Sequence, residues 1–277
     1  MEKIDNSLVQ HGPFNQRVYL MKVNSQDFPD IIFKIDMLAK REGYTKIFVK
    51  VPQQVKPLFS EMGYVEEAAI PGFYHGDIEA VFLAKYLDSK RQVDLAKDKV
   101  DAILALTKDK AGAGHQNTPD GDILIRQAGL EDAETIAQLF REVFESYPFP
   151  IHDPDYLRET METHIQYFCA VEDGKMVAVS SSEMDREAQN VEMTDFATLP
   201  ECRGKNLSQR LLKVMEERMR DLGMHTFYTI ARALSPGMNI TFARCGYHYG
   251  GTLTNNTNIC GKIESMNVWY KSAGEKT

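Results

Sequence analysis

Apolar and polar positions alternate along this chain with two periods, one typical of helices and one typical of strands. Across residues 28–39 the apolar positions follow the i, i+3, i+4, i+7 spacing of an amphipathic helix. The segments 191–200 and 225–231 read as strands, and a helical pattern follows each of them, at 203–219 and 235–244. The pattern therefore predicts alternating strands and helices, as in an α/β protein.

One stretch interrupts this pattern and divides the chain. Residues 111–121 are rich in Gly, Pro and polar residues and show no periodicity, which predicts a linker. A helical pattern at 88–109 precedes it, and a strand at 122–128 follows it. We therefore expect an N-terminal domain with a trailing helix at 1–110 and a second domain at 122–277.

Composition limits the class of protein. The 277 residues allow one large or two small domains, and 43% hydrophobic with 26% charged residues is ordinary for a globular protein in water. No run approaches the roughly 18 to 20 apolar residues of a membrane-spanning helix. The N-terminus also lacks the apolar core of a signal peptide. We expect a cytoplasmic protein with no membrane partner.

Charge and cysteine usage limit the partners further. A net charge of -8 argues against a nucleic-acid partner, because such proteins draw affinity from clustered Lys and Arg. The four cysteines show no CxxC spacing, which predicts buried or inert thiols, no disulfide and no metal site.

The segment 203–208 has the chemistry of an anion site. It joins a predicted strand to the start of a predicted helix, where the first amides lack intrahelical partners and the helix dipole is positive. Arg203 and Lys205 add positive charge at the same place. The sequence therefore predicts a bound phosphate group, as in a cofactor that carries a pyrophosphate.

This segment resembles motif A of the Gcn5-related N-acetyltransferases, Q/R-x-x-G-x-G/A, whose amides hold the pyrophosphate of acetyl-CoA. Arg203 fits the first position, while Asn206 and Ser208 stand at the two glycine positions. Pro200-Glu201 likewise resembles the end of the family's fourth strand. The resemblance implies acetyl-CoA as cosubstrate and no metal. The expected contacts are Ala197, Thr198, Leu199, Arg203, Gly204, Lys205, Asn206, Leu207 and Ser208.

A second match lies in the last predicted helix. Asn239 and the segment 242–247 resemble motif B, an Asn followed by Tyr-x-Lys-x-Gly-Phe, which adds Asn239 and Phe242 to the expected cosubstrate contacts. Phe242 stands where the family often has a tyrosine that protonates the CoA thiolate. A phenyl ring cannot donate a proton, so we assign no general acid. The resemblance implies an α/β (α+β) fold, a mixed twisted sheet flanked by helices.

Three pairs of segments echo each other between the two halves. Gly-Tyr-Thr-Lys-Ile-Phe at 43–48 parallels 223–228, while 59–64 parallels 242–247 and Gly-Asp-Ile-Glu at 76–79 parallels 261–264. We therefore expect the N-terminal half to be a truncated, degenerate copy of the acetyltransferase fold. It lacks the Arg-x-x-Gly pattern before its helix, so we expect it to bind no CoA. Its expected work is packing, dimerisation into a homodimer or closure of the acceptor site.

The implied reaction is direct acetyl transfer to an amine. A lysine-type amine has a pKa of about 10.4, so the site must remove a proton near neutral pH. We expect Glu192 to be the base, directly or through water, and Asp195 to orient the acceptor ammonium. The two are three residues apart, so they point to opposite faces of a strand unless a bulge intervenes. The family commonly has a bulge near this point.

A proline-rich loop is the expected acceptor wall. Residues 147–154 follow a predicted helix at 130–146, and their prolines restrict the backbone. The resemblance places such a loop at the acceptor pocket, with Tyr147 and Phe149 as substrate contacts. A rigid surface turn would have the same sequence pattern, so this alternative stays open. Arg232, just after a predicted strand, is the expected clamp for an acceptor carboxylate.

Within the family, the resemblance is to members that acetylate the terminal amine of β-lysine. It covers essentially the whole chain and rests on TDFATLPECRGK, ESYPFPI, MNITFARCGY and GKIESMNVWYK. It implies the product Nε-acetyl-β-lysine, a compatible solute, and a lysine 2,3-aminomutase as pathway neighbour. Two alternatives stay open. One is an acetyltransferase for another amine, such as a polyamine, an aminoglycoside or a protein amine; the other is a noncatalytic acyl-CoA sensor.

Overall fold

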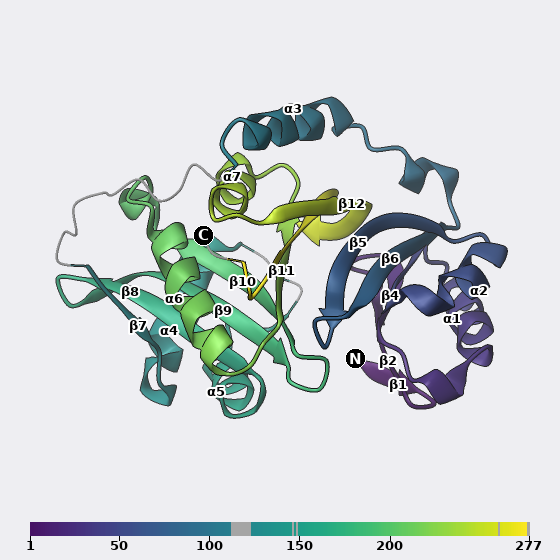
Figure 1. Ribbon diagram of the computed structural model, residues 1–277, viewed down its shortest axis with the longest axis horizontal. Coiled ribbons are helices and arrows are strands. Elements are labelled where there is room, and N and C mark those ends of the chain that lie inside the picture. Colours follow the sequence, from purple (N-terminus) through teal and green to yellow (C-terminus); the bar gives the residue numbers. More distant parts are fainter. Residues whose placement is uncertain (112–122, 146, 148, 260, 276–277) are drawn as a thin grey trace.

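The β-strands of the protein form one continuous sheet. The computed structural model describes residues 1–111, 123–145, 147, 149–259 and 261–275. Its 13-stranded sheet has the order β1-β2-β3-β4-β6-β5-β12-β13-β11-β10-β9-β8-β7 (Figure 1). The strands are β1 (Glu2–Ile4), β2 (Ser7–Gly12), β3 (Arg17–Lys22), β4 (Lys46–Pro52), β5 (Val65–Tyr74), β6 (Ile78–Tyr86), β7 (Ile123–Gln127), β8 (Ile165–Glu172), β9 (Lys175–Asp185), β10 (Asn190–Thr198), β11 (Thr226–Arg232), β12 (His248–Ile259) and β13 (Lys262–Ser272).

Helices cover this sheet on both sides. The α-helices are α1 (Asp30–Arg41), α2 (Lys56–Glu61), α3 (Lys97–Lys108), α4 (Ala133–Val143), α5 (Pro154–Thr163), α6 (Leu207–Asp221) and α7 (Pro236–Arg244). Short 3-10 turns occur at Ser25–Asp27, Gln53–Val55, Ser89–Gln92, Leu130–Asp132 and Pro200–Cys202. Helix α3 runs across the top of the molecule in Figure 1 and packs against α7.

One order of elements occurs twice along the chain. In the N-terminal half β3 is parallel to β4 with α1 between them, and α2 leads to the antiparallel pair β5 and β6. In the C-terminal half β10 is parallel to β11 with α6 between them, and α7 leads to β12 and β13. The two halves meet where β5 pairs with β12 in the centre of Figure 1. The domain limits stay a prediction, and the expected linker lies outside the described residues beyond its first position.

Two glycines allow this central contact. A Cβ atom on Gly251, whose φ is +142°, would lie 2.2 Å from the carbonyl oxygen of Glu67 on β5. A Cβ atom on Gly250 would lie 2.6 Å from the carbonyl oxygen of Ala69. Because these contacts are with backbone, a larger residue at Gly251 would force the two strands apart.

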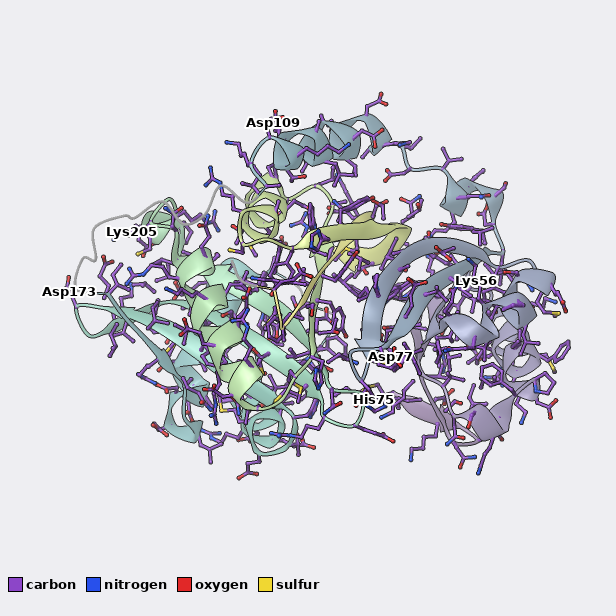
Figure 2. The ribbon with its side chains drawn as sticks, viewed as in Figure 1. Lys56, His75, Asp77, Asp109, Asp173 and Lys205 are labelled. Atoms are coloured by element: carbon purple, nitrogen blue, oxygen red, sulfur yellow. The ribbon has the colours of Figure 1, made fainter. Side chains whose placement is uncertain are left out.

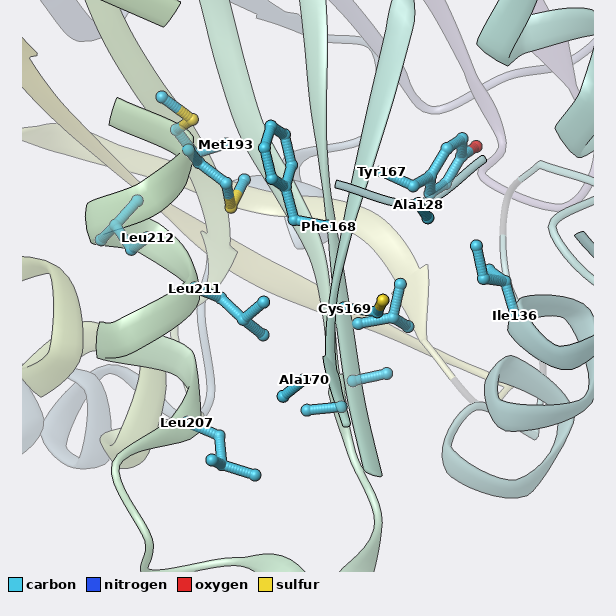
Figure 3. Packing of buried hydrophobic residues seen from close by; sticks show 14 of the residues in the cluster. Ala128, Ile136, Tyr167, Phe168, Cys169, Ala170, Met193, Leu207, Leu211 and Leu212 are labelled. Atoms are coloured by element: carbon cyan, nitrogen blue, oxygen red, sulfur yellow. The ribbon is translucent and has the colours of Figure 1, made fainter. Parts of the chain in front are cut away.

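The C-terminal part of the sheet is buried on both faces. Figure 3 shows Leu211 and Leu212 of α6 packed toward Met193 on one face, while Ile136 of α4 lies on the other face of the sheet. In the N-terminal half, Val18 and Leu20 of β3 belong to the cluster covered by α1. Strand alternation turns the intervening residues of β3 toward the C-terminal half, where an apolar cluster joins the two halves.

Two expected helices are shorter in the structure. The pattern at 88–109 contains only a 3-10 turn and then α3, because the buried Arg91 side chain bonds Asn15 O and Asn255 O and holds this segment against β12. The pattern at 130–146 yields a 3-10 turn and then α4, which ends at Val143 because Phe144 is extended.

Three cysteines of the described chain, Cys169, Cys202 and Cys245, are buried free thiols, and Cys260 lies outside the described residues. No group of metal-ligating side chains occurs among the residues that the structure describes. In the same residues, no helix combines the length and the apolar character needed to cross a membrane.

Candidate active site

The parallel strands β10 and β11 separate to open a cavity. They pair only from Asn190–Thr226 to Glu192–Tyr228, although β10 continues for several residues. A cavity of about 410 Å³ lies beyond the last pair, lined by residues 194–196 of β10 and 229–232 of β11. Met238 and Phe242 of α7 close one side of it. The separation of the strands is therefore what creates room for a ligand in the sheet.

A bulge brings Asp195 to this cavity. The register between β10 and β9 shifts between Thr194 and Ala197, and Asp195 has a left-handed φ of 53°. Its carboxylate accepts hydrogen bonds from Ser181 Oγ at 2.5 Å and from the hydroxyl of Tyr147. Burial raises the pKa of Asp195 although these two bonds oppose the rise. Asp195 and Tyr147 both line the cavity.

Glu192 lies deeper, before the strands separate. It stands across from Glu183 on β9 and from Tyr228 on β11. The pKa of Glu192 is raised to about 8, first by burial and then by the negative charge of Glu183, while the positive charge of Lys50 opposes the rise. A carboxyl with this pKa can both accept and release a proton near neutral to mildly alkaline pH, as a general base for an amine must. Glu192 does not line the cavity itself.

The N-terminal half contributes to the surroundings of Glu192. Lys50 of β4 places its Nζ 3.5 Å from the hydroxyl of Tyr228, and it lies over the rings of Tyr228 and Phe73. The pKa of Tyr19 on β3 is raised chiefly by burial, and the charge of Glu192 raises it as well. The carboxylates therefore lie where the two halves of the molecule meet. Sequence analysis did not identify Lys50 and Glu183, because only strand pairing brings them close to Glu192.

A second cavity continues from the first toward the start of α6. It measures about 520 Å³ and includes six of the expected cosubstrate contacts, Thr198, Arg203, Gly204, Asn206, Leu207 and Ser208. Four residues line both cavities, Val143, Phe196, Ser235 and Met238. The two cavities are therefore neighbours and form one groove, apolar near Phe196 and basic near Arg203 and Arg244.

The start of α6 fits a pyrophosphate. Gly204 and Asn206 take left-handed φ values of 87° and 57°, and the helix begins at Leu207. The amides of Leu207 and Ser208 have no carbonyl one turn back in the helix, so they remain available to an anion. Arg203 and Arg244 make no ion pair with any described residue. Donor amides, helix dipole and two cations thus converge on one end of the groove.

Some expected contacts lie elsewhere. Lys205 is at the outer edge of the molecule (Figure 2), where its Nζ pairs with Glu172 at 2.6 Å. Asn239 is fully buried: its Nδ2 donates to Ser235 O at 2.7 Å, and its Oδ1 accepts from Trp269 Nε1 at 2.9 Å. The structure thus gives both side chains internal partners away from the groove.

Backbone contacts and the acceptor wall differ from expectation in part. The amide of Leu199, an expected cosubstrate contact, already donates to Val177 O at 3.0 Å. Ala197 is buried and lines neither cavity. Phe149 packs against the hydrophobic core beside α4 and is absent from the cavity wall.

The expected carboxylate clamp already has a partner. Arg232 lines the first cavity, but its Nε and Nη2 bind the two carboxylate oxygens of Glu264 at 3.0 and 2.9 Å. Phe242 also lines this cavity and meets Phe196 edge to face at 5.6 Å. Ser235 lines both cavities, so its hydroxyl lies where they join. Sequence analysis did not identify this residue as part of the site.

Comparison with known proteins supports an acyl-transfer site. The model of the Acetyltransferase (GNAT) family matches residues 133–247. The chain is 40% identical to the Beta-lysine N(6)-acetyltransferase of Methanococcus maripaludis, over 98% of this chain and 99% of that protein. It is 30% identical to N-acetyltransferase YodP of Bacillus subtilis, over 96% and 95%. It is 33% identical to the Beta-lysine N(6)-acetyltransferase of Methanosarcina mazei, over 88% and 97%.

Proposed function

The chain belongs to the GNAT acetyltransferase family, whose members use acetyl-CoA, and we propose that it acetylates the terminal amine of β-lysine to give Nε-acetyl-β-lysine. The observation that carries the proposal is the groove itself. It runs from the basic start of α6, past Phe196, to a cavity that holds the carboxylate of Asp195. Two relatives named for β-lysine support the choice of acceptor.

The chain's own residues divide the work along this groove. The amides of Leu207 and Ser208, with Arg203, bind the pyrophosphate, and the apolar wall at Phe196 and Met238 holds the pantetheine arm. When bound, acetyl-CoA supplies the thioester carbonyl that the acceptor amine attacks. These contacts fix the cosubstrate at one end and leave the splayed strands open for the acceptor.

At the other end, two carboxylates handle the amine. Asp195 orients the incoming ammonium, and Tyr147 and Ser181 hold its carboxylate in place. Glu192 receives the proton through a bridging water, because it lies on the same strand but behind the cavity wall. Ser235, at the junction of the cavities, donates a hydrogen bond to the departing thiolate.

We further propose the cellular setting that the resemblance implies. The product would serve as a compatible solute, a lysine 2,3-aminomutase would supply β-lysine, and the reaction would take place in the cytoplasm. The homodimer stays a prediction, which light scattering on the purified protein checks.

The acceptor is tested by measuring thiol release from acetyl-CoA. β-Lysine, α-lysine and spermidine are offered separately, alongside a blank without enzyme. Rapid release with β-lysine and poor release with α-lysine are expected, and the product should carry acetyl on the terminal nitrogen by NMR. Preference for spermidine would support a polyamine acetyltransferase instead. Binding of acetyl-CoA without release from any acceptor would identify a sensor.

A further inference from the structure

Arg17 of β3 is a buried arginine that forms no ion pair with a described residue. Both of its described hydrogen bonds leave from Nη1, to Asn256 O at 2.6 Å and to Thr257 Oγ1 at 3.3 Å. Its Nε is buried and has no partner in the described part of the chain. The two donors on the edge formed by Nε and Nη2 therefore have no described protein partner, and a carboxylate is the group that satisfies such a pair through two parallel hydrogen bonds.

The surroundings of Arg17 favour an anion. Two further buried cations, Lys46 and Arg91, lie close enough to influence this region, and one buried carboxylate, Glu67, serves all three. Glu67 pairs with Lys46 at 2.8 Å. The pKa of Arg17 is lowered to about 10, chiefly by burial; the charge of Arg91 acts in the same direction, while Tyr19 and Glu67 oppose it. An anionic ligand would offset this excess of buried positive charge.

Arg17 also faces open space next to the acceptor cavity. It lines a cavity of about 200 Å³ together with the polar side chains of Gln10 and Asn15. Tyr147 lines this cavity and the acceptor cavity, while its hydroxyl bonds Asp195. Thr257, which accepts a bond from Arg17, lines the acceptor cavity as well. Arg17 and Asp195 thus line two cavities that share Tyr147.

We propose that Arg17 binds the carboxylate of the acceptor, so that the N-terminal half completes the acceptor site and selects amino acids over simple amines. This inference rests on the proposed function. Asp195 holds the terminal amine at one end, and Arg17 holds the acid at the other end. Arg232 is not required for this task because Glu264 already occupies its guanidinium.

The test compares β-lysine with β-lysinamide, in which a neutral carboxamide replaces the carboxylate. For each protein, kcat/KM is measured with both acceptors, and their ratio is the readout. The ratio cancels any loss of folded enzyme. Arg17→Gln should lower the ratio roughly 10- to 100-fold, chiefly through KM for β-lysine, because a charged hydrogen-bonded pair is lost. Arg17→Lys keeps the charge without the fork and should restore part of the ratio.

Arg91→Gln is the matched control. Arg91 is another buried arginine of the same region, but its Nε, Nη1 and Nη2 all have described partners, Asn255 O, Thr45 Oγ1 and Asn15 O. This variant should lose stability and lower the ratio far less than Arg17→Gln does, because Arg91 adds charge to the region but has no free donor. If wild-type protein acetylates β-lysine and Arg17→Gln keeps the wild-type ratio, the inference alone is overturned. If wild-type protein acetylates neither compound, the proposed function fails and the inference fails with it.

Discussion

The two halves of the molecule share an order of elements but differ at the start of the helix after the first parallel strand. Before α6, Gly204 and Asn206 take left-handed conformations and the first amides face a cavity. Before α1, the carboxylate of Asp27 fills the turn and accepts from Asn6 N at 3.0 Å and Ser7 Oγ at 2.6 Å. The turn before α6 leaves its first amides facing a cavity, whereas in the turn before α1 the amides of Gln26 and Asp27 both donate to Asn24. The fold alone therefore does not create the anion site.

The parallel strands differ in the same way. Glu192 pairs across from Tyr228 in the C-terminal half, whereas Tyr19 pairs across from Phe48 in the N-terminal half. The N-terminal half thus has aromatic rings where the C-terminal half has its buried carboxylate. It still contributes cations, Lys50 and Arg17, to the space between the halves. By the inference drawn above, the N-terminal half supplies one wall of the acceptor site.

The largest expected effect comes from removing the carboxylate. Glu192→Gln should lower kcat/KM by about 10²- to 10⁴-fold at pH 9, the range typical of a general base. In wild type, kcat/KM should rise as pH increases to about 8, because Glu192 must be ionised to accept a proton. The variant should lack this rise. A pH-rate profile for both proteins checks the prediction, and matching profiles would exclude Glu192 as the base.

The same variant should gain stability at high pH. The pKa of Glu192 is raised in the folded state, so wild type loses stability as pH rises from about 4.3, the ordinary glutamate pKa, to about 8. Glu192→Gln pays no such cost. Its Tm should exceed that of wild type above pH 8, and the difference should shrink toward pH 5. Equal Tm values at both pH values would argue that this carboxyl is not buried as described.

The next effect concerns the union of the halves. Gly251→Ala should lower the free energy of unfolding by about 2–4 kcal/mol, because the new Cβ meets the backbone of β5 and the φ is unfavourable. Gly174→Ala is the control: its φ is +76°, but nothing lies within 4 Å of the added atom. Urea denaturation measures both. Equal losses would mean that the close approach of β5 and β12 contributes nothing.

A smaller effect is expected at the anion site. Arg203→Gln should raise KM for acetyl-CoA about 3- to 10-fold and leave KM for the acceptor unchanged, since one cation at the helix start is removed. Lys205→Gln is the comparison, because Lys205 pairs with Glu172 away from the groove. Steady-state kinetics with acetyl-CoA varied distinguish the two. A larger effect at Lys205 would reverse the assignment.

The smallest effect should come from the corresponding turn of the N-terminal half. Asp27→Asn should lower Tm by a few degrees at pH 7 without changing KM for acetyl-CoA. The bonds from Ser7 and Asn6 lower the pKa of Asp27, so its contribution is present above the ordinary aspartate pKa of about 3.9 and is lost as pH falls below it. Thermal unfolding at pH 7 and pH 3 checks this. A change in KM would connect this turn to the cosubstrate.

Six of the residues that sequence analysis expected to contact the cosubstrate line one end of the groove, and they could be predicted together because they are nearly consecutive. Arg203, Gly204 and Asn206 lie in one loop, and local chemistry predicts that loop. The sequence did not determine whether a bulge occurs at Asp195, because a bulge depends on the register with the neighbouring strand β9. The clamp role of Arg232 could not be judged, because Glu264 reaches it from β13. Lys50 and Arg17 were missed for the same reason: only long-range pairing brings the N-terminal half to the site.

Calorimetric titration of the purified protein with acetyl-CoA tests the central claim most directly, that one half of a repeated fold keeps the cosubstrate site. The account predicts one acetyl-CoA per chain, weakened by Arg203→Gln and unaffected by Asp27→Asn. Two equivalent sites per chain, or one site weakened by Asp27→Asn and not by Arg203→Gln, would contradict it.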